Sequence, residues 1–154
     1  MSRIQTQGVL LGVDYGNVRI GIAICDPDRI LASPLETYRR QTERADAAYF
    51  CRIATVHRAV GWVVGLPLHA GGEESDKSLE VRAFGVWLER STNLPVVFWD
   101  ERFTTALAEE ALLEAKLSHR KRRQRRDKVA AQLILRAFLE AGCPAEGTQS
   151  SAAN

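Results

Sequence analysis

The order of the apolar segments along the chain constrains the fold more than any other feature of this sequence. Residues 9–14 and 20–26 are rich in Val, Ile and Leu. The "YGNVR" between them contains the Gly and Asn that tight turns favour, so we predict a hairpin. A third strand is predicted over residues 33–40. The two later runs "GWVVGLP" and "LPVVFWDE" are nearly all apolar, which is typical of strands that are covered on both faces.

Segments with a helical spacing of apolar residues alternate with these later strands. We predict helices over residues 42–60, 74–91 and 104–115, and a last helix that begins at Asp127 and ends near Gly142. Three antiparallel strands followed by crossover units predict an α/β fold. In this fold, a five-stranded mixed sheet carries helices on both faces.

The composition favours one reduced, intracellular domain. The chain has 154 residues, 45% of them hydrophobic, which suffices for one core. We therefore expect a single domain over residues 1–142 and a flexible tail over residues 143–154. The three cysteines, Cys25, Cys51 and Cys143, form no CxxC pair, which argues against disulfides and structural zinc. The sequence shows neither a signal peptide nor an apolar run of the roughly 20 residues that span a bilayer, so we predict a cytoplasmic protein without a membrane partner.

The charge is distributed unevenly along the chain. The basic segment, residues 116–128 with the sequence "KLSHRKRRQRRDK", carries eight Lys or Arg and one acid. The rest of the chain, with 13 bases and 18 acids, is acidic. Such a segment attracts a polyanion through phosphate contacts and counterion release. A solvated loop is the alternative interpretation.

Acidic residues stand where the predicted apolar elements end or begin. Asp14 ends the first strand, Asp100 and Glu101 end the last strand, and Asp127 opens the last helix. Each alone could be an ordinary turn, strand-end or N-cap residue. Several carboxylates gathered at one end of a sheet would instead repel one another unless a cation were bound. Ligands that are all oxygen favour Mg²⁺ or Mn²⁺.

Five ordered motifs resemble those of one protein family. They are "GVDYGNVRIGIAICD", "ASPLETYRR", "VVGLP", "VVFWDERFTT" and "DKVAAQLILRAFLE", and they span roughly residues 8–140. Together they resemble the YqgF (RuvX-like) family, described as Holliday junction resolvases or as nucleases of pre-16S ribosomal RNA. The resemblance implies an RNase H-like fold. The chain departs from the family after Pro67, where "LHAGGEES" replaces the Met-Asp-Gly-Thr stretch that members often carry.

The resemblance also implies a catalytic site. The family's acidic positions fall on Asp14, Glu101 and Asp127, which would hold two Mg²⁺ or Mn²⁺ ions for phosphodiester hydrolysis. Strand alternation allows only one of Asp100 and Glu101 to face the site, and we prefer Glu101. The predicted nucleic-acid contacts are Arg19, Arg102, Arg120, Lys121, Arg122, Arg123, Arg125, Arg126 and Lys128. We expect Trp62, Trp87 and Trp99 to belong to the core rather than to stack on bases.

The sequence thus predicts a metal-dependent nuclease of structured nucleic acid, with processing of the 5′ end of pre-16S ribosomal RNA as the preferred activity. Two alternatives stay open, a resolvase of branched DNA and a nucleic-acid-binding module without catalysis. A homodimer would suit a two-fold symmetric junction. The sequence leaves open whether the substrate is RNA or DNA, whether the ion is Mg²⁺ or Mn²⁺, and whether cleavage is endonucleolytic or exonucleolytic.

Overall fold

Five strands form one mixed sheet at the centre of the molecule. The computed structural model describes residues 3–103 and 119–144, with side chains of the last helix described from residue 126 onward. The strands are β1 (Val9–Asp14), β2 (Arg19–Cys25), β3 (Ala32–Arg39), β4 (Ala59–Leu66) and β5 (Val96–Asp100), in the order β3-β2-β1-β4-β5. β1, β2 and β3 are antiparallel neighbours, and β4 and β5 run parallel to β1. The predicted five-stranded mixed sheet is confirmed.

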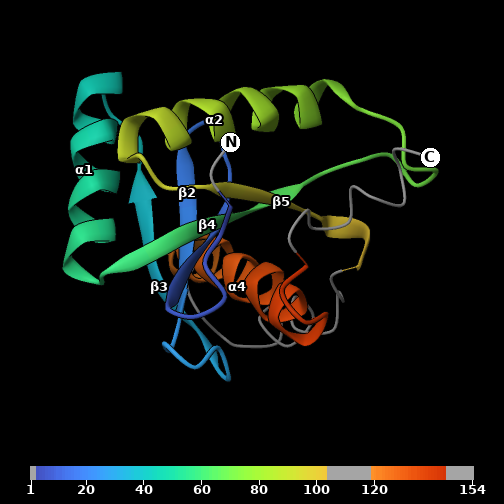
Figure 1. Cartoon of the computed structure of the whole chain (residues 1–154). Coiled ribbons are helices and arrows are strands. Elements are labelled where there is room, and N and C mark those ends of the chain that lie inside the picture. The colour runs from blue at the N-terminus through green and yellow to red at the C-terminus, as the bar shows by residue number, and fades with distance from the viewer. Residues whose placement is uncertain (1–2, 104–118, 145–154) are drawn as a thin grey trace.

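Helices cover both faces of this sheet, as the sequence predicted. α1 (Glu43–Val56) and α2 (Asp76–Thr92) pack on one face, and α4 (His119–Glu140) packs on the other (Figure 1). A short 3-10 helix, η1 (Glu101–Phe103), follows β5 directly. The helix predicted over residues 104–115 lies outside the described residues. In the described ranges, every helix is too short or too polar to cross a membrane.

Two predicted helix boundaries are wrong. α4 begins at His119, so Asp127 lies inside the helix and does not cap it. The residues before Asp127 are mostly Arg, Lys and Gln, which have good helix propensity and extend the helix backwards. The helix predicted over residues 42–60 ends at Val56, because Arg58 adopts a left-handed conformation with φ of 54° before β4 begins.

Each face of the sheet has its own apolar cluster. Leu11, Val13 and Trp62 belong to the cluster under α1 and α2. Leu10 and Trp99 belong to the cluster under α4. Successive strand residues therefore alternate between the two clusters, as the pleat requires. This alternation fixes which face each residue at the sheet edge looks toward.

Candidate active site

One edge of the sheet collects the candidate residues. β1, β4 and β5 are parallel, so their carboxyl ends meet at this edge, where the antiparallel β2 begins with Arg19. β1 ends at Asp14 and β5 ends at Asp100, after which Glu101 opens η1. Residues that are far apart in the sequence thus meet at this edge of the sheet.

Asp14 lies on the face that α4 covers. Leu10, four residues earlier on β1, is in the cluster under α4. A Cβ atom added at Gly12 would lie 2.8 Å from Leu135 Cβ on the same helix. Because side chains alternate along a strand, Asp14 shares this face, whereas Val13 points to the other cluster.

Glycines flank Asp14 on both neighbouring strands. Gly21 is its cross-strand partner on β2, and the parallel register of β1 with β4 brings Gly65 to its other side. A Cβ atom added at Gly21 would lie 1.9 Å from the backbone oxygen of Asp127. A Cβ atom added at Gly65 would lie 2.6 Å from Glu101 Oε1. Asp127 and Glu101 therefore occupy the space over the two glycines beside Asp14.

The two adjacent acids at the end of β5 have separate surroundings. Asp100 is 2% exposed and is tied to Arg102, whose Nε lies 2.8 Å from Asp100 Oδ2 and whose backbone N–H donates to Oδ1 at 2.9 Å. Arg102 Nη1 also donates to the carbonyl oxygen of Ala70 at 3.1 Å. Asp100 thereby fixes the tight turn of η1, while Glu101 extends over Gly65 toward the α4 face. Arg102 thus pairs with Asp100 in this structure, and its phosphate contact stays a prediction.

Arg19 forms an ion pair with Asp127. Its Nε donates to Asp127 Oδ2 at 2.9 Å, and both side chains are largely buried, with 29% and 23% exposed. This contact joins the start of β2 to α4 across 108 residues of sequence. The predicted phosphate-binding arginine therefore neutralises one of the predicted metal-binding acids in this structure.

The carboxylates have the chemistry to bind a hard cation, but in the described residues they do not form a complete metal site. Within the part of the chain that the structure describes, no three Asp, Glu, His or Cys side chains make a metal site as they stand. Asp14, Glu101 and Asp127 nevertheless share one face and offer only carboxylate oxygens, which suits Mg²⁺ or Mn²⁺. Binding by all three would require Asp127 to exchange Arg19 for the cation.

The other predicted nucleic-acid contacts are described only in part. Arg126 and Lys128 are half-buried on α4. The side chains of Arg120, Lys121, Arg122, Arg123 and Arg125 lie outside the described part of the structure. Their backbone is helical, so the basic segment from His119 onward belongs to α4 and is not a loop.

Sequence reasoning missed three residues that shape the edge. Gly21 and Gly65 clear the space beside Asp14, and a glycine inside a predicted strand is a known sign of close backbone approach. Arg39 is the cross-strand partner of Arg19, so the two arginines lie side by side at the same edge. The motif "TYRR" contained Arg39, but spacing alone did not indicate its pairing.

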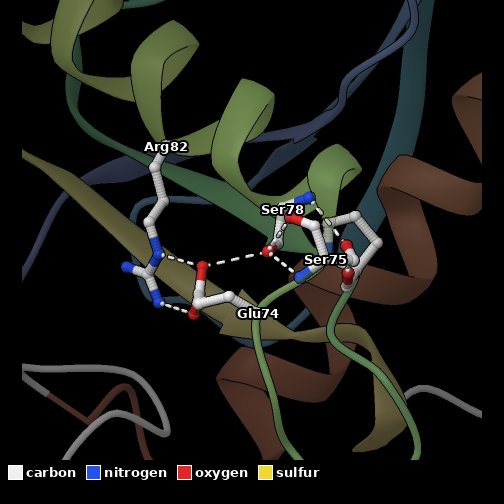
Figure 2. A network of polar contacts seen from close by, with 5 residues as sticks. Glu74, Ser75, Ser78 and Arg82 are labelled. Atoms are coloured by element: carbon white, nitrogen blue, oxygen red, sulfur yellow. Dashed lines mark hydrogen bonds and ion pairs between the residues drawn. The ribbon is translucent and has the colours of Figure 1, made fainter.

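The loop after Pro67 is anchored at both ends. Ser75 Oγ donates to the Pro67 carbonyl oxygen at 2.8 Å and accepts the Ser78 N–H at 2.9 Å, while Ser78 Oγ accepts the Ser75 N–H. Figure 2 shows this capping box beside the bidentate contact of Arg82 with Glu74, at 2.8 Å for both nitrogens. The Arg82 guanidinium holds the pKa of the Glu74 carboxyl below its usual range. The segment that departs from the expected family motif thus has its own fixed geometry.

This sheet order, with helices on both faces, defines a protein of the RNase H-like fold. Thermus thermophilus RuvC in complex with a Holliday junction is similar, with a TM-score of 0.55, 16% identity and coverage of 88% of this chain and 97% of that chain. The fowlpox virus resolvase in complex with Holliday junction DNA has a TM-score of 0.50 and 11% identity, covering 88% of this chain and 99% of that chain. At these identities the similarity shows the fold alone.

Sequence relatives identify the family more narrowly. The family described as "RuvX: Holliday junction resolvase" matches residues 8–141, so the chain belongs to the RuvX family. A relative from Rhodopirellula baltica is 54% identical over 134 residues, which cover 87% of this chain and 78% of that protein. One from Rhodobacter capsulatus is 41% identical over 133 residues, covering 86% and 84%. Both are named "Putative pre-16S rRNA nuclease". The resemblance to the YqgF (RuvX-like) family is confirmed.

Proposed function

We propose that this chain is a metal-dependent nuclease that hydrolyses phosphodiester bonds of structured nucleic acid, with the 5′ end of pre-16S ribosomal RNA as its substrate. The observation that carries the proposal is that the Glu101 carboxylate and the Asp127 backbone lie over Gly65 and Gly21, the two glycines beside Asp14. Membership of the RuvX family and the names of the two relatives support the reaction and the substrate.

The three acids would hold the metal ions. Asp14 ends the central strand β1 and would be the ligand that the middle of the sheet contributes. Glu101 and Asp127 would each hold one side. Bound Mg²⁺ or Mn²⁺ would supply an activated water and would neutralise charge on the attacked phosphate.

The cationic side chains of the chain would hold the substrate. Arg19 lies beside Asp127 at 2.9 Å, so exchange of its partner from that carboxylate to a substrate phosphate would free Asp127 as substrate arrives. Arg39 stands next to Arg19 and adds a second cation at the same edge. Lys and Arg contacts to phosphate carry little base information, so this contribution to binding depends weakly on sequence.

Conservative variants of the three acids test this function. Asp14→Asn, Glu101→Gln and Asp127→Asn should each lower cleavage of a pre-16S RNA fragment roughly a hundredfold or more, since even groups that support metal ligands contribute tenfold to hundredfold. Binding of the RNA, followed by fluorescence anisotropy in EDTA, should stay close to that of the native protein. Asp28→Asn, at an exposed turn, is the matched control and should cleave normally.

The choice of substrate is tested with the same proteins. If a four-way DNA junction is cleaved faster than the RNA fragment, the substrate is branched DNA and not ribosomal RNA. The description of the family favours this alternative. Cleavage that persists in EDTA would contradict the metal mechanism. Binding without cleavage under every metal condition would leave the protein as a non-catalytic nucleic-acid-binding module.

A further inference from the structure

The turn between β1 and β2 separates the carboxylates from a hollow on the opposite side of the same edge. Asp14 faces α4, but the next residue, Tyr15, faces α2, where its ring centroid lies 4.7 Å from that of Phe84. Behind this turn lies an open hollow of about 600 Å³ between the end of β3, the start of α1 and the middle of α2. Its lining includes Tyr15, Arg40, Glu43, Asp46, Phe84 and Trp87.

Several polar side chains of the hollow contact one another. Arg40 Nη1 donates to the Tyr15 hydroxyl at 2.8 Å, and Arg40 Nε lies 3.5 Å from Asp46 Oδ2. The Trp87 indole N–H donates to Glu43 Oε1 at 3.0 Å. The lining holds two arginines, Arg39 and Arg40, and three acids, Glu43, Asp46 and Glu80, in contrast to the concentrated positive charge that holds phosphate. The hollow suits a neutral, flat ligand with polar edges.

The size and the rings of the hollow also suit such a ligand. Its volume falls within the roughly 300–1,000 Å³ that is usual for small-ligand sites. Of the three aromatic residues in its wall, Phe84 is buried, and Arg40 and Lys77 lie over the Tyr15 ring at 5.2 and 5.0 Å from its centroid. Trp87 is half-buried and is therefore the ring that could accept the face of a nucleobase. Trp87 was expected in the core with Trp62 and Trp99, but it is the only one of the three that lines this hollow.

We propose that the hollow binds one unpaired nucleobase of the substrate, close along the strand to the phosphodiester at Asp14. This inference rests on the proposed nuclease function. Asp14 and Tyr15 are neighbours in the chain, so only the turn after β1 separates the two sites, and a nucleic-acid strand that crosses this turn would reach both. Arg39 contributes to the lining of the hollow, while its cross-strand pairing with Arg19 puts its side chain on the α4 face, where it could contact a phosphate of the same strand.

The consequence is selection of substrates by structure. A base can enter the hollow only when it is unpaired and unstacked, whereas the basic segment attracts any polyanion. Cleavage would then occur next to an unpaired nucleotide, such as one at the end of a stem or at a branch point. Every base has an aromatic face, so the preference would depend on pairing and only weakly on base identity.

Small ligands test what the hollow recognises. The full ¹⁵N-labelled protein in EDTA is titrated with adenosine monophosphate or with ribose 5-phosphate, which carries the same phosphate without a base. The chain has three tryptophan indole signals; Trp62 and Trp99, 0% and 4% exposed, serve as internal references. We expect the Trp87 indole signal to move with the nucleotide and not with ribose 5-phosphate. Equal shifts from both compounds, or none from either, would contradict the proposal.

A variant whose side chain fills the hollow tests whether the hollow contributes to substrate binding. Ala83 is exposed on α2 and lines the hollow, whereas Ala48 is exposed on α1 outside it, so Ala83→Phe and Ala48→Phe form a matched pair. Their affinity for an RNA hairpin with a single-stranded tail is measured by anisotropy in EDTA. Ala83→Phe should bind roughly fivefold or more weakly, the lower range for one stacked base, and Ala48→Phe should bind normally.

Abasic positions in the tail complete the test. An abasic nucleotide at the position that enters the hollow should weaken binding to the native protein and should remove the difference from Ala83→Phe. Equal RNA binding by Ala83→Phe and Ala48→Phe would overturn the proposal and leave the hollow to a protein partner. Because binding is measured without metal, this result is independent of cleavage, and a failure of the nuclease assay alone would contradict only the proposed function.

Discussion

Gly21 and Gly65 show how residues without side chains contribute to a site. At Gly65, an added Cβ atom would meet two flexible side-chain ends, Glu101 Oε1 at 2.6 Å and Ile134 Cδ1 at 2.5 Å. At Gly21, it would meet backbone, the Asp127 oxygen at 1.9 Å. The close contact at Gly65 can be relieved if the Glu101 carboxylate moves. The close contact at Gly21 can be relieved only if α4 moves away from the sheet.

Gly65→Ala should therefore reduce activity more than stability. We expect cleavage to fall at least tenfold, because Glu101 is displaced, and the free energy of unfolding to fall by about 1–3 kcal/mol, as for a typical overpacked site. Gly61→Ala is the control on the same strand, since the nearest atoms to its Cβ atom would be apolar side-chain atoms, Ile4 Cγ1 at 2.8 Å, Ile4 Cδ1 at 3.1 Å and Leu10 Cδ2 at 3.4 Å. Urea unfolding and cleavage rates measure both effects. Equal loss of activity in the two variants would show that Glu101 is not the cause.

The residue scale also shows what the sequence could predict of the site. The family resemblance pointed to Glu101, and strand alternation allowed only one of Asp100 and Glu101 to face the site. The structure has Asp100 clamped by Arg102 while Glu101 extends over Gly65. The Arg19–Asp127 pair could not be predicted, because neither residue has a local signal for a partner 108 positions away. The roles of the three acids in catalysis stay predictions.

At the scale of elements, a buried network fixes the end of β3 against α1. The Tyr38 hydroxyl donates to Asp46 Oδ1 at 2.6 Å, and the Gln41 N–H donates to the same oxygen at 2.9 Å. Asp46 is 2% exposed, so the loss of a donor leaves a buried acceptor short of a partner. Burial, together with the hydrogen bond to Asp46, raises the pKa of Tyr38 to about 12.

Tyr38→Phe should destabilise the fold by about 1–3 kcal/mol near neutral pH, the cost of an unsatisfied buried group. The pKa of Tyr38 is raised from 10.0 in the unfolded chain, so the phenol contributes its full stability below pH 10. Between pH 10 and about 12, the unfolded chain loses this proton first, and the contribution declines. Urea unfolding of both proteins across this range should show a steeper decline for the native one. Parallel curves would exclude this assignment.

A second element-scale prediction concerns the loop before α2. Ser75→Ala removes the N-cap and the contact to Pro67, whereas Thr42→Ala removes only the N-cap contact of α1 to the Ala45 N–H. Loss of an N-cap costs about 1 kcal/mol, so Ser75→Ala should lower the melting temperature more than Thr42→Ala. Hydrogen exchange should also rise over residues 68–74 in Ser75→Ala alone. Equal effects would mean that the Pro67 contact does not hold the loop.

Elements were predicted best where the sequence carries its own periodicity. The five strands were found from apolar runs and turn residues, because buried strands between helices have few other compositions. The start of α4 was missed because Asp127 has the chemistry of an N-cap while the Arg and Lys before it suit a helix equally well. Contacts with the rest of the molecule decide whether the helix starts before or at Asp127, and the spacing of residues in the sequence does not reveal those contacts.

At the scale of the whole molecule, charge should dominate the affinity for nucleic acid. The basic segment is one strongly positive stretch in an otherwise acidic chain. Affinity for RNA should fall steeply with salt, and Arg122→Gln with Arg123→Gln should reduce the slope of log affinity against log salt by about 2 if both contact phosphate. The control pair Arg52→Gln with Arg90→Gln lies on α1 and α2, on the other face of the sheet, and should leave the slope unchanged. An unchanged slope in the first pair would remove the basic segment from the interface.

The glycines beneath α4 also limit how this scaffold can diversify. The distance between α4 and the sheet is limited by Leu135 Cβ and the Ala131 backbone oxygen at Gly12, and by the Asp127 backbone at Gly21, so a side chain at either glycine would lift the helix. Proteins with this fold would therefore keep the same distance between this helix and their central strands. Differences in the substrates that they bind would have to arise in the turns and loops around the site, such as those before β2 and after β4.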